Sequence, residues 1–93
     1  MADIDIRAQG DGRYAVEVRQ GAATTSHTVA VPATLADEVG APEAGDEEVI
    51  RASFEFLLAR EPASSILPEF SLEVISRYFG DYREALRAHL GGG

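Results

Sequence analysis

Six carboxylates fall in the short segment 35–48, which contains no basic residue. They are Asp37, Glu38, Glu43, Asp46, Glu47 and Glu48. Such a cluster can bind a divalent cation or the basic surface of another protein. A calcium loop alternates its oxygen ligands around a glycine turn and ends in a distal glutamate, and Asp46-Glu47-Glu48 followed by Val49 does not match that pattern. We therefore expect no metal and no cofactor, and take the six acids as candidates for binding a protein partner.

The same segment accounts for most of the net charge. The chain has 16 acidic and 8 basic residues, which gives a formal net charge of -8. Residues 1–34 and 49–93 each contribute -1, so residues 35–48 contribute -6. If charge steers a partner toward this protein, the segment 35–48 is predicted to do it.

The remaining polar residues offer little catalytic chemistry. His27 shares its strand parity with Val29 and Val31, which predicts a partly buried or sheet-edge position, and His89 falls in the last turn of the final helix. Ser64-Ser65 lies in neither a nucleophile elbow nor a phosphate-binding loop. The chain has no cysteine, which excludes disulfides and thiolate chemistry. We expect a protein that is not an enzyme.

Alternating apolar and polar residues predict three strands near the N-terminus, at 3–8, 13–19 and 24–31. Asp11-Gly12 is a strong hairpin signal, and short connections make neighbouring strands antiparallel. The polar face carries three arginines and three acids, so we expect ion pairing there instead of nucleic-acid binding. These six residues are Asp3, Asp5, Arg7, Arg13, Glu17 and Arg19.

The rest of the chain is predicted to be helical. The expected helices are 34–39, 47–60, 72–79 and 82–90, with N-caps at Thr34, Asp46, Ser71 and Asp81 and a left-handed Gly80. The main helix, 47–60, has a broad apolar arc that predicts contacts on two sides, and Arg51 and Glu55 are spaced for an ion pair. The fold class is α+β, an N-terminal three-stranded antiparallel β-meander packed against three to four C-terminal α-helices. Residues 1–90 form a single domain and residues 91–93 a flexible glycine tail.

One resemblance bears on function. The segment 27–32, followed by Leu35 to Val39 and then Val49 to Leu58, resembles the strand, short helix and second helix of ribbon–helix–helix repressors and antitoxins. The resemblance implies an intertwined dimer that acts in transcription. The sequence departs from that family because the strand presents no basic side chain to DNA beyond His27, and because two strands precede it and two helices follow it.

Taken together, these patterns predict a small soluble acidic non-enzymatic protein-interaction module, with segment 35–48 or an exposed sheet edge as its contact surface. The alternative is an antitoxin-like or transcription-associated dimer. No signal peptide or membrane span is evident, so we expect a cytoplasmic protein with a protein partner and without a membrane or nucleic-acid partner. The sequence leaves open whether the protein forms a homodimer.

Overall fold

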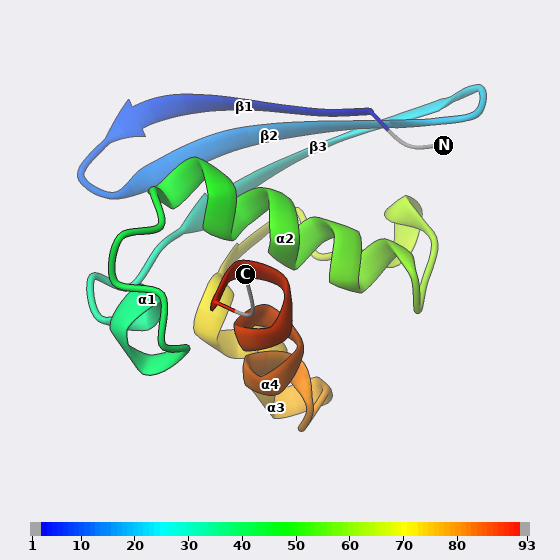
Figure 1. The fold of residues 1–93 in the computed structure, drawn as a ribbon. Coiled ribbons are helices and arrows are strands. Elements are labelled where there is room, and N and C mark those ends of the chain that lie inside the picture. Colours follow the sequence, from blue (N-terminus) through cyan, green and yellow to red (C-terminus); the bar gives the residue numbers. More distant parts are fainter. Residues whose placement is uncertain (1–2, 92–93) are drawn as a thin grey trace.

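The computed structural model describes residues 3–91 and shows a twisted sheet with helices on one face (Figure 1). The sheet has four strands in the order β1-β2-β3-β4. Their bounds are β1 Asp3–Gly10, β2 Arg13–Gln20, β3 Ala23–Ala30 and β4 Glu69–Ser71. The helical elements are α1 Leu35–Glu38, α2 Asp46–Leu58, η1 Ala63–Ser65, η2 Leu72–Val74, α3 Ile75–Tyr78, α4 Tyr82–Leu86 and η3 Arg87–Gly91. This arrangement confirms the predicted α+β class and the antiparallel meander of β1 to β3.

The predicted strand count is wrong by one, because β4 adds a fourth strand next to β3. β4 runs parallel to β3 and pairs Phe70 with Val29. The main-chain N–H of Thr28 also donates to the carbonyl of Pro68 at 2.8 Å, just before β4 begins. Three residues are too few to show a period of two, so only the contact with a distant strand makes this segment extended.

The first hairpin turn is confirmed at Asp11-Gly12. Asp11 has a φ of 54° and Gly12 a φ of 73°. Positive φ at both central residues is the type I′ geometry, whose twist matches that of the flanking strands. The turn therefore sets the register of β1 against β2, in which Ile6 lies opposite Val16.

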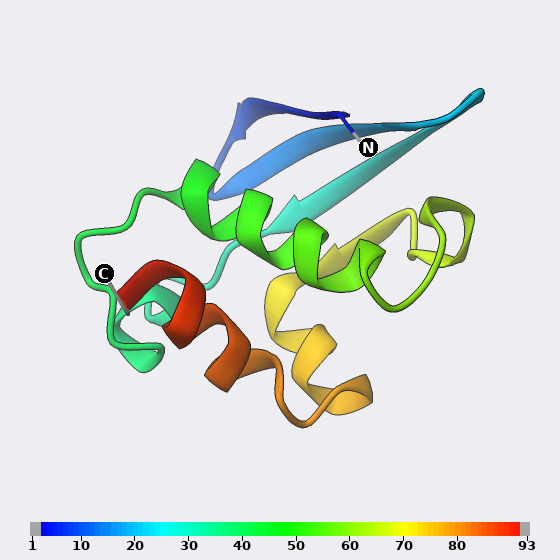
Figure 2. The same ribbon diagram turned by 45° about the vertical axis from the view of Figure 1, so that its right-hand side comes forward.

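The helix α2 separates the sheet from the C-terminal helices (Figure 2). It contacts β1 on one side and α4 and η3 on the other, as the broad apolar arc predicts. Its buried side chains include Ile50, Phe54 and Leu57, which join Val16, Val18 and Val29 of the sheet in one hydrophobic cluster. The aromatic rings in this cluster come mainly from the helices, so the helices supply much of its bulk.

Several helix ends differ from their predictions. The residue that caps α2 is Gly45, and Asp46 is instead the first helical residue. After a helix, the left-handed position is taken by Gly40, with a φ of 74°, and not by Gly80. Gly40 N–H donates to Asp37 O at 3.0 Å and Ala41 N–H to Ala36 O at 2.8 Å, which is the Schellman pattern that closes a helix.

The two C-terminal helices are less regular than predicted. The segment 72–79 begins with the 3-10 turn η2 before α3, and its backbone is already extended at Phe79. The segment 82–90 changes from α4 to the π-helical η3 at Arg87. The predicted glycine tail begins at Gly91, which ends η3, and residues 92–93 lie outside the described residues.

Candidate functional site

The predicted acidic residues lie on α1, on the loop after it and in the first turn of α2. All six side chains are exposed. Glu43 and Glu48 line one shallow hollow with Leu90 of η3, so the fold brings these two acids together. Within residues 3–91 no group of three or more histidines and acids is placed to hold a metal ion.

Two of the six acids already have partners inside the chain. Glu38 pairs with Arg83 of α4, with Nη2 and Oε1 3.1 Å apart, and it accepts a hydrogen bond from Thr34 Oγ1 at 2.8 Å. Asp46 accepts a hydrogen bond from the Tyr14 hydroxyl at 2.7 Å. These bonds tie the acidic segment to α4 and to β2.

The contact with Asp46 also shifts the pKa of the Tyr14 hydroxyl. The hydrogen bond to the Asp46 carboxylate raises the pKa of Tyr14, and partial burial and the negative charges of Asp46 and Glu47 add to this effect. Among the described residues, no ion pair involves Asp37, Glu43, Glu47 or Glu48. These four acids are therefore the part of the predicted set that is available for another molecule.

His27 has a structural position in the middle of the sheet. Its side chain is only 4% exposed, and its ring lies 5.4 Å from the ring of Phe54. His27 Nδ1 lies 2.7 Å from the carbonyl oxygen of Leu67, which can only accept, so Nδ1 carries the proton. His27 Nε2 lies 2.8 Å from Thr25 Oγ1. The Nδ1 bond thus holds the loop before β4 against β3, whereas the Nε2 contact stays within β3. His27 is buried in an inner strand and does not lie at a sheet edge.

A buried pair of hydroxyls lies between α2 and α4, and the sequence analysis did not single it out. Ser53 Oγ donates to the carbonyl oxygen of Val49 at 2.7 Å, so the Tyr82 hydroxyl must donate to Ser53 Oγ across 2.6 Å. Burial raises the pKa of Tyr82 to about 12, because the charged phenolate would be poorly solvated there. Both side chains are 0% exposed, so neither hydroxyl is open to a substrate.

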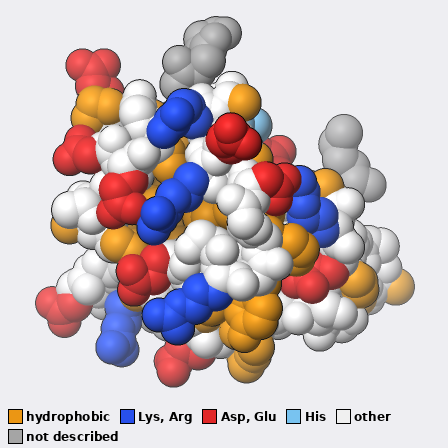
Figure 3. All heavy atoms as spheres, turned by 90° about the horizontal axis from the view of Figure 1, so that it is seen from below, with side chains coloured by type: hydrophobic (Ala, Val, Ile, Leu, Met, Phe, Trp, Pro, Cys, Tyr) orange, Lys and Arg blue, Asp and Glu red, His pale blue; other side chains and the backbone are white. Residues whose placement is uncertain are grey.

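An apolar groove lies at the opposite end of α2 from the acidic segment. It has a volume of 420 Å³ and runs between the end of α2, the loop before β4 and α3. Its walls include Leu57, Ile66, Phe70 and Ile75, and Glu61 supplies the one carboxylate in the lining. Figure 3 shows the face formed by the helices, where hydrophobic side chains reach the surface among charged ones.

Two large apolar side chains border this groove and are exposed. Leu67 is 46% exposed and Tyr78 is 71% exposed, and they come from different elements, the loop before β4 and α3. Exposed apolar side chains that gather around a hollow are typical of a binding surface, whereas scattered ones are not. Sequence reasoning missed the groove because its walls come from segments whose proximity no local pattern reveals.

The groove is held in shape by a set of aromatic and cationic contacts. Phe56 packs edge-on against Phe79, with ring centroids 5.7 Å apart. The guanidinium of Arg60 lies 3.7 Å from the centre of the Phe56 ring and also pairs with Asp81 at 2.8 Å. A cation held over a ring in this way fixes the end of α2 to the turn before α4.

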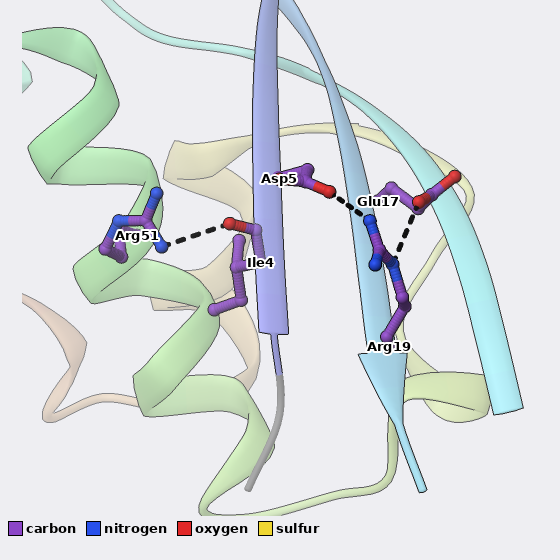
Figure 4. A network of polar contacts seen from close by, with 5 residues as sticks. All are labelled: Ile4, Asp5, Glu17, Arg19 and Arg51. Carbon is purple, nitrogen blue, oxygen red and sulfur yellow. Dashed lines mark hydrogen bonds and ion pairs between the residues drawn. The ribbon is translucent and has the colours of Figure 1, made fainter. Parts of the chain in front are cut away.

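The polar face of the sheet shows part of the expected ion pairing: among the described residues, Arg19 pairs with acids there and Arg7 and Arg13 do not. Arg19 pairs with Asp5 across the strands at 2.5 Å and with Glu17 at 3.3 Å (Figure 4). Asp5 and Glu17 lie directly opposite each other in the register, so Arg19 offsets the repulsion between them. The predicted Arg51–Glu55 pair is wrong. Arg51 donates to the carbonyl of Ile4 at 3.1 Å, and Glu55 Oε1 lies 3.7 Å from His89 Nε2.

Comparison with protein-family models, with curated proteins and with solved structures found no match. No helix within residues 3–91 is both long and apolar enough to cross a membrane. The predicted transcription-associated dimer stays a prediction, although β3, the strand in the resemblance, has β2 on one side and β4 on the other.

Proposed function

We propose that this protein is a non-enzymatic interaction module whose apolar groove binds a segment of a partner protein. The observation that carries the proposal is the exposure of Leu67 and Tyr78 around a hollow of 420 Å³. Burial of exposed apolar surface is the main favourable term in most protein associations, and aromatic residues are enriched among the side chains that dominate binding energy.

The partner segment is expected to combine apolar side chains with positive charge. Glu61 lies in the lining of the groove, and no ion pair among the described residues involves it. The chain as a whole has a net charge of -8. An apolar segment with one or two basic residues matches both features, because the cation can approach Glu61 while the apolar side chains fill the hollow.

The acidic segment 35–48 has a different role in this proposal. It lies at the N-terminal end of α2 and the groove at the C-terminal end, and a helix of 13 residues is about 20 Å long. That span exceeds the screening length of about 8 Å at physiological ionic strength. The four available acids therefore raise the rate at which a basic partner arrives, while the groove determines how long it stays.

Support for a non-enzymatic role comes from the side chains that could otherwise do chemistry. His27, Ser53 and Tyr82 are buried and each is hydrogen-bonded to another part of the chain. Their hydroxyl and imidazole groups connect segments of the fold. The proposal assigns them to folding and assigns binding to the groove.

The test uses peptides selected from a random library against the wild-type protein as the probe. We expect the selected peptides to be enriched in aromatic, aliphatic and basic residues. The double variant Leu67→Ser/Tyr78→Ser should weaken their binding by about tenfold or more, since loss of an interface anchor costs about 2 kcal/mol. Glu61→Gln should weaken only the peptides that carry a basic residue.

The matched control is Pro42→Ser, which changes an exposed apolar residue within the acidic segment and away from the groove. It should leave peptide binding unchanged. Peptides that bind Leu67→Ser/Tyr78→Ser as tightly as they bind the wild type would contradict the proposal. A selection that yields acidic peptides would contradict the charge of the partner.

A further inference from the structure

We propose that a second copy of this chain pairs with the outer edge of β1 and extends the sheet across a twofold axis at Ile6. β1 is an edge strand, since the sheet order places β2 on one side of it only. An edge strand carries a row of main-chain N–H and C=O groups that can pair with another strand. The proposal concerns a different surface from the groove and does not depend on it.

The hydrogen bond from Arg51 identifies which residues of β1 direct their main-chain N–H and C=O groups toward the open edge of the sheet. Arg51 Nη1 donates to the carbonyl oxygen of Ile4 at 3.1 Å, and Figure 4 shows this carbonyl directed toward α2 and away from β2. In an antiparallel ladder, successive residues alternate between pairing with the neighbour and facing away from it. Ile4, Ile6 and Ala8 therefore present their main-chain groups to the open edge.

This alternation restricts how two β1 strands can pair. In an antiparallel pair the outward residues of one copy must lie opposite outward residues of the other. Three registers near the middle of the strand satisfy this rule, with the twofold axis at Asp5, at Ile6 or at Arg7. The strand is regular from Asp3 to Ala8, and its register against β2 shifts only after Ala8.

Charge selects one of the three registers. An axis at Asp5 places Asp3 opposite Arg7 twice, but it also places the two Asp5 carboxylates opposite each other. An axis at Arg7 places two guanidinium groups opposite each other. An axis at Ile6 places Asp5 of each copy opposite Arg7 of the other. Like charges directly opposite across strands are destabilising and opposite charges are stabilising, so the axis at Ile6 is favoured.

The apolar face supports the same register. Ile6 is partly buried against the core and Ala8 is exposed. With the axis at Ile6, the two Ile6 side chains lie side by side, and Ala8 of one copy covers Ile4 of the other. The apolar layer beneath the sheet would then continue from one copy into the next.

Arg51 is compatible with this pairing. In the proposed register Ile4 C=O accepts a hydrogen bond from Ala8 N–H of the second copy. A carbonyl oxygen has two lone pairs, so it can accept that bond and the bond from Arg51 together. Arg51 thus covers the edge in the single chain and remains in place in the pair.

Because the sequence contains no cysteine, single cysteines can report the register directly. We would prepare Asp5→Cys, Ile6→Cys and Arg7→Cys, and oxidise each mildly at a concentration where the wild type sediments as a dimer. Each variant forms a symmetric disulfide only if the axis passes at or close to its own position, because the Cα atoms must approach to about 6 Å. Arg13→Cys, in β2 on the same face as Asp5 and Arg7, measures the background from random collisions.

We expect Ile6→Cys to give the fastest disulfide formation and the other three variants to stay near the background rate. Faster cross-linking at position 5 or 7 would overturn the register. A wild-type chain that sediments as a monomer up to millimolar concentration would overturn the dimer.

A second measurement keeps the proposal testable if Ile6→Cys folds poorly. Arg7→Glu places acids opposite each other twice in the pair and should weaken self-association by about tenfold. Arg13→Glu makes the same charge change on the same face away from the edge and should leave self-association unchanged. Equal weakening by the two substitutions would show that net charge alone is responsible and would overturn the assigned pairing.

Discussion

The two ends of α2 present contrasting surfaces. At the N-terminal end, charged side chains crowd the first turn and the loop before it, and all six acids of segment 35–48 are exposed. At the C-terminal end, Leu57 and the neighbouring segments form the walls of an apolar groove bordered by Leu67 and Tyr78. One helix thus carries a polar end that water solvates well and an apolar end that water solvates poorly.

The contrast teaches which end can hold a partner and which can attract one. Exposed charges interact weakly at contact because water and salt screen them, but their field extends beyond contact. Apolar surface acts only at contact, where its burial is favourable. We expect the acidic end to influence association rates and the groove end to influence dissociation rates.

The largest expected effect comes from removing the support of the groove end. Phe56 is 7% exposed and packs against Phe79, Tyr82 and the Arg60 guanidinium. Phe56→Ala should lower the free energy of unfolding by about 3–5 kcal/mol, because it leaves a cavity in the core. Urea denaturation measures this change.

The matched substitution at the acidic end is Glu48→Ala, which removes an exposed side chain from the first turn of α2. It should change the free energy of unfolding by no more than about 0.5 kcal/mol. Similar losses from Phe56→Ala and Glu48→Ala would break the comparison between the two ends.

The next-largest effect concerns stability at alkaline pH and distinguishes two tyrosines that contact α2. Burial raises the pKa of Tyr82 to about 12, so folding favours the neutral hydroxyl. The stability that this provides is fully present below about pH 10, the ordinary pKa of tyrosine in the unfolded chain, and is lost as the pH rises toward the folded value. The loss should reach about 2–3 kcal/mol by the upper end of that range.

Thermal or urea unfolding between about pH 9 and about pH 12 measures this loss. Tyr82→Phe should show a shallower decline with pH than the wild type. Tyr14→Phe, which removes the hydroxyl of the partly exposed tyrosine beside Asp46, should leave most of the decline in stability unchanged. If Tyr14→Phe flattened the curve instead, the acidic end would be the more important one for alkaline stability.

A smaller effect separates the rates of binding at the two ends. With a selected basic peptide as the probe, neutralising Asp37, Glu43, Glu47 and Glu48 to their amides should lower the association rate by up to about tenfold at low salt. The dissociation rate should change little. Tyr78→Ser should do the opposite and raise the dissociation rate, and stopped-flow fluorescence distinguishes the two outcomes.

The smallest effect concerns the ion pair between Glu38 and Arg83, whose side chains are 41% and 52% exposed. A double-mutant cycle with Glu38→Gln and Arg83→Gln should give a coupling energy of about 0.2–1 kcal/mol that declines with added salt. A coupling well above that range would mean that the acidic end contributes to folding more than its exposure suggests.

Much of the sheet could be predicted because its first three strands follow one another closely. Alternation of side chains and the Asp11-Gly12 turn are local signals, and they determine the pairing of β1 with β2. The position of α2 and its two-sided contacts also follow from its apolar arc. The polar sheet face was predicted to hold ion pairs, and Arg19 with Asp5 and Glu17 confirms this for one of its three arginines.

The remaining features depend on residues far apart in the chain. β4 is extended only because it meets β3, and the groove exists only because the loop before β4, α3 and the end of α2 converge. Asp46 was expected to cap α2, but its carboxylate instead accepts a hydrogen bond from the Tyr14 hydroxyl. Gly80 and Gly40 both follow short helices, and only the backbone path decides which becomes left-handed.

By itself, the sequence determined the strands, the main helix and the concentration of negative charge in segment 35–48, because periodicity, turn chemistry and charge are properties of neighbouring residues. The tertiary structure alone decided which acids acquire partners, where His27 is buried and where an apolar surface stays exposed. Those outcomes depend on which distant side chains meet, and the free energy of burial is settled only when the whole chain has packed.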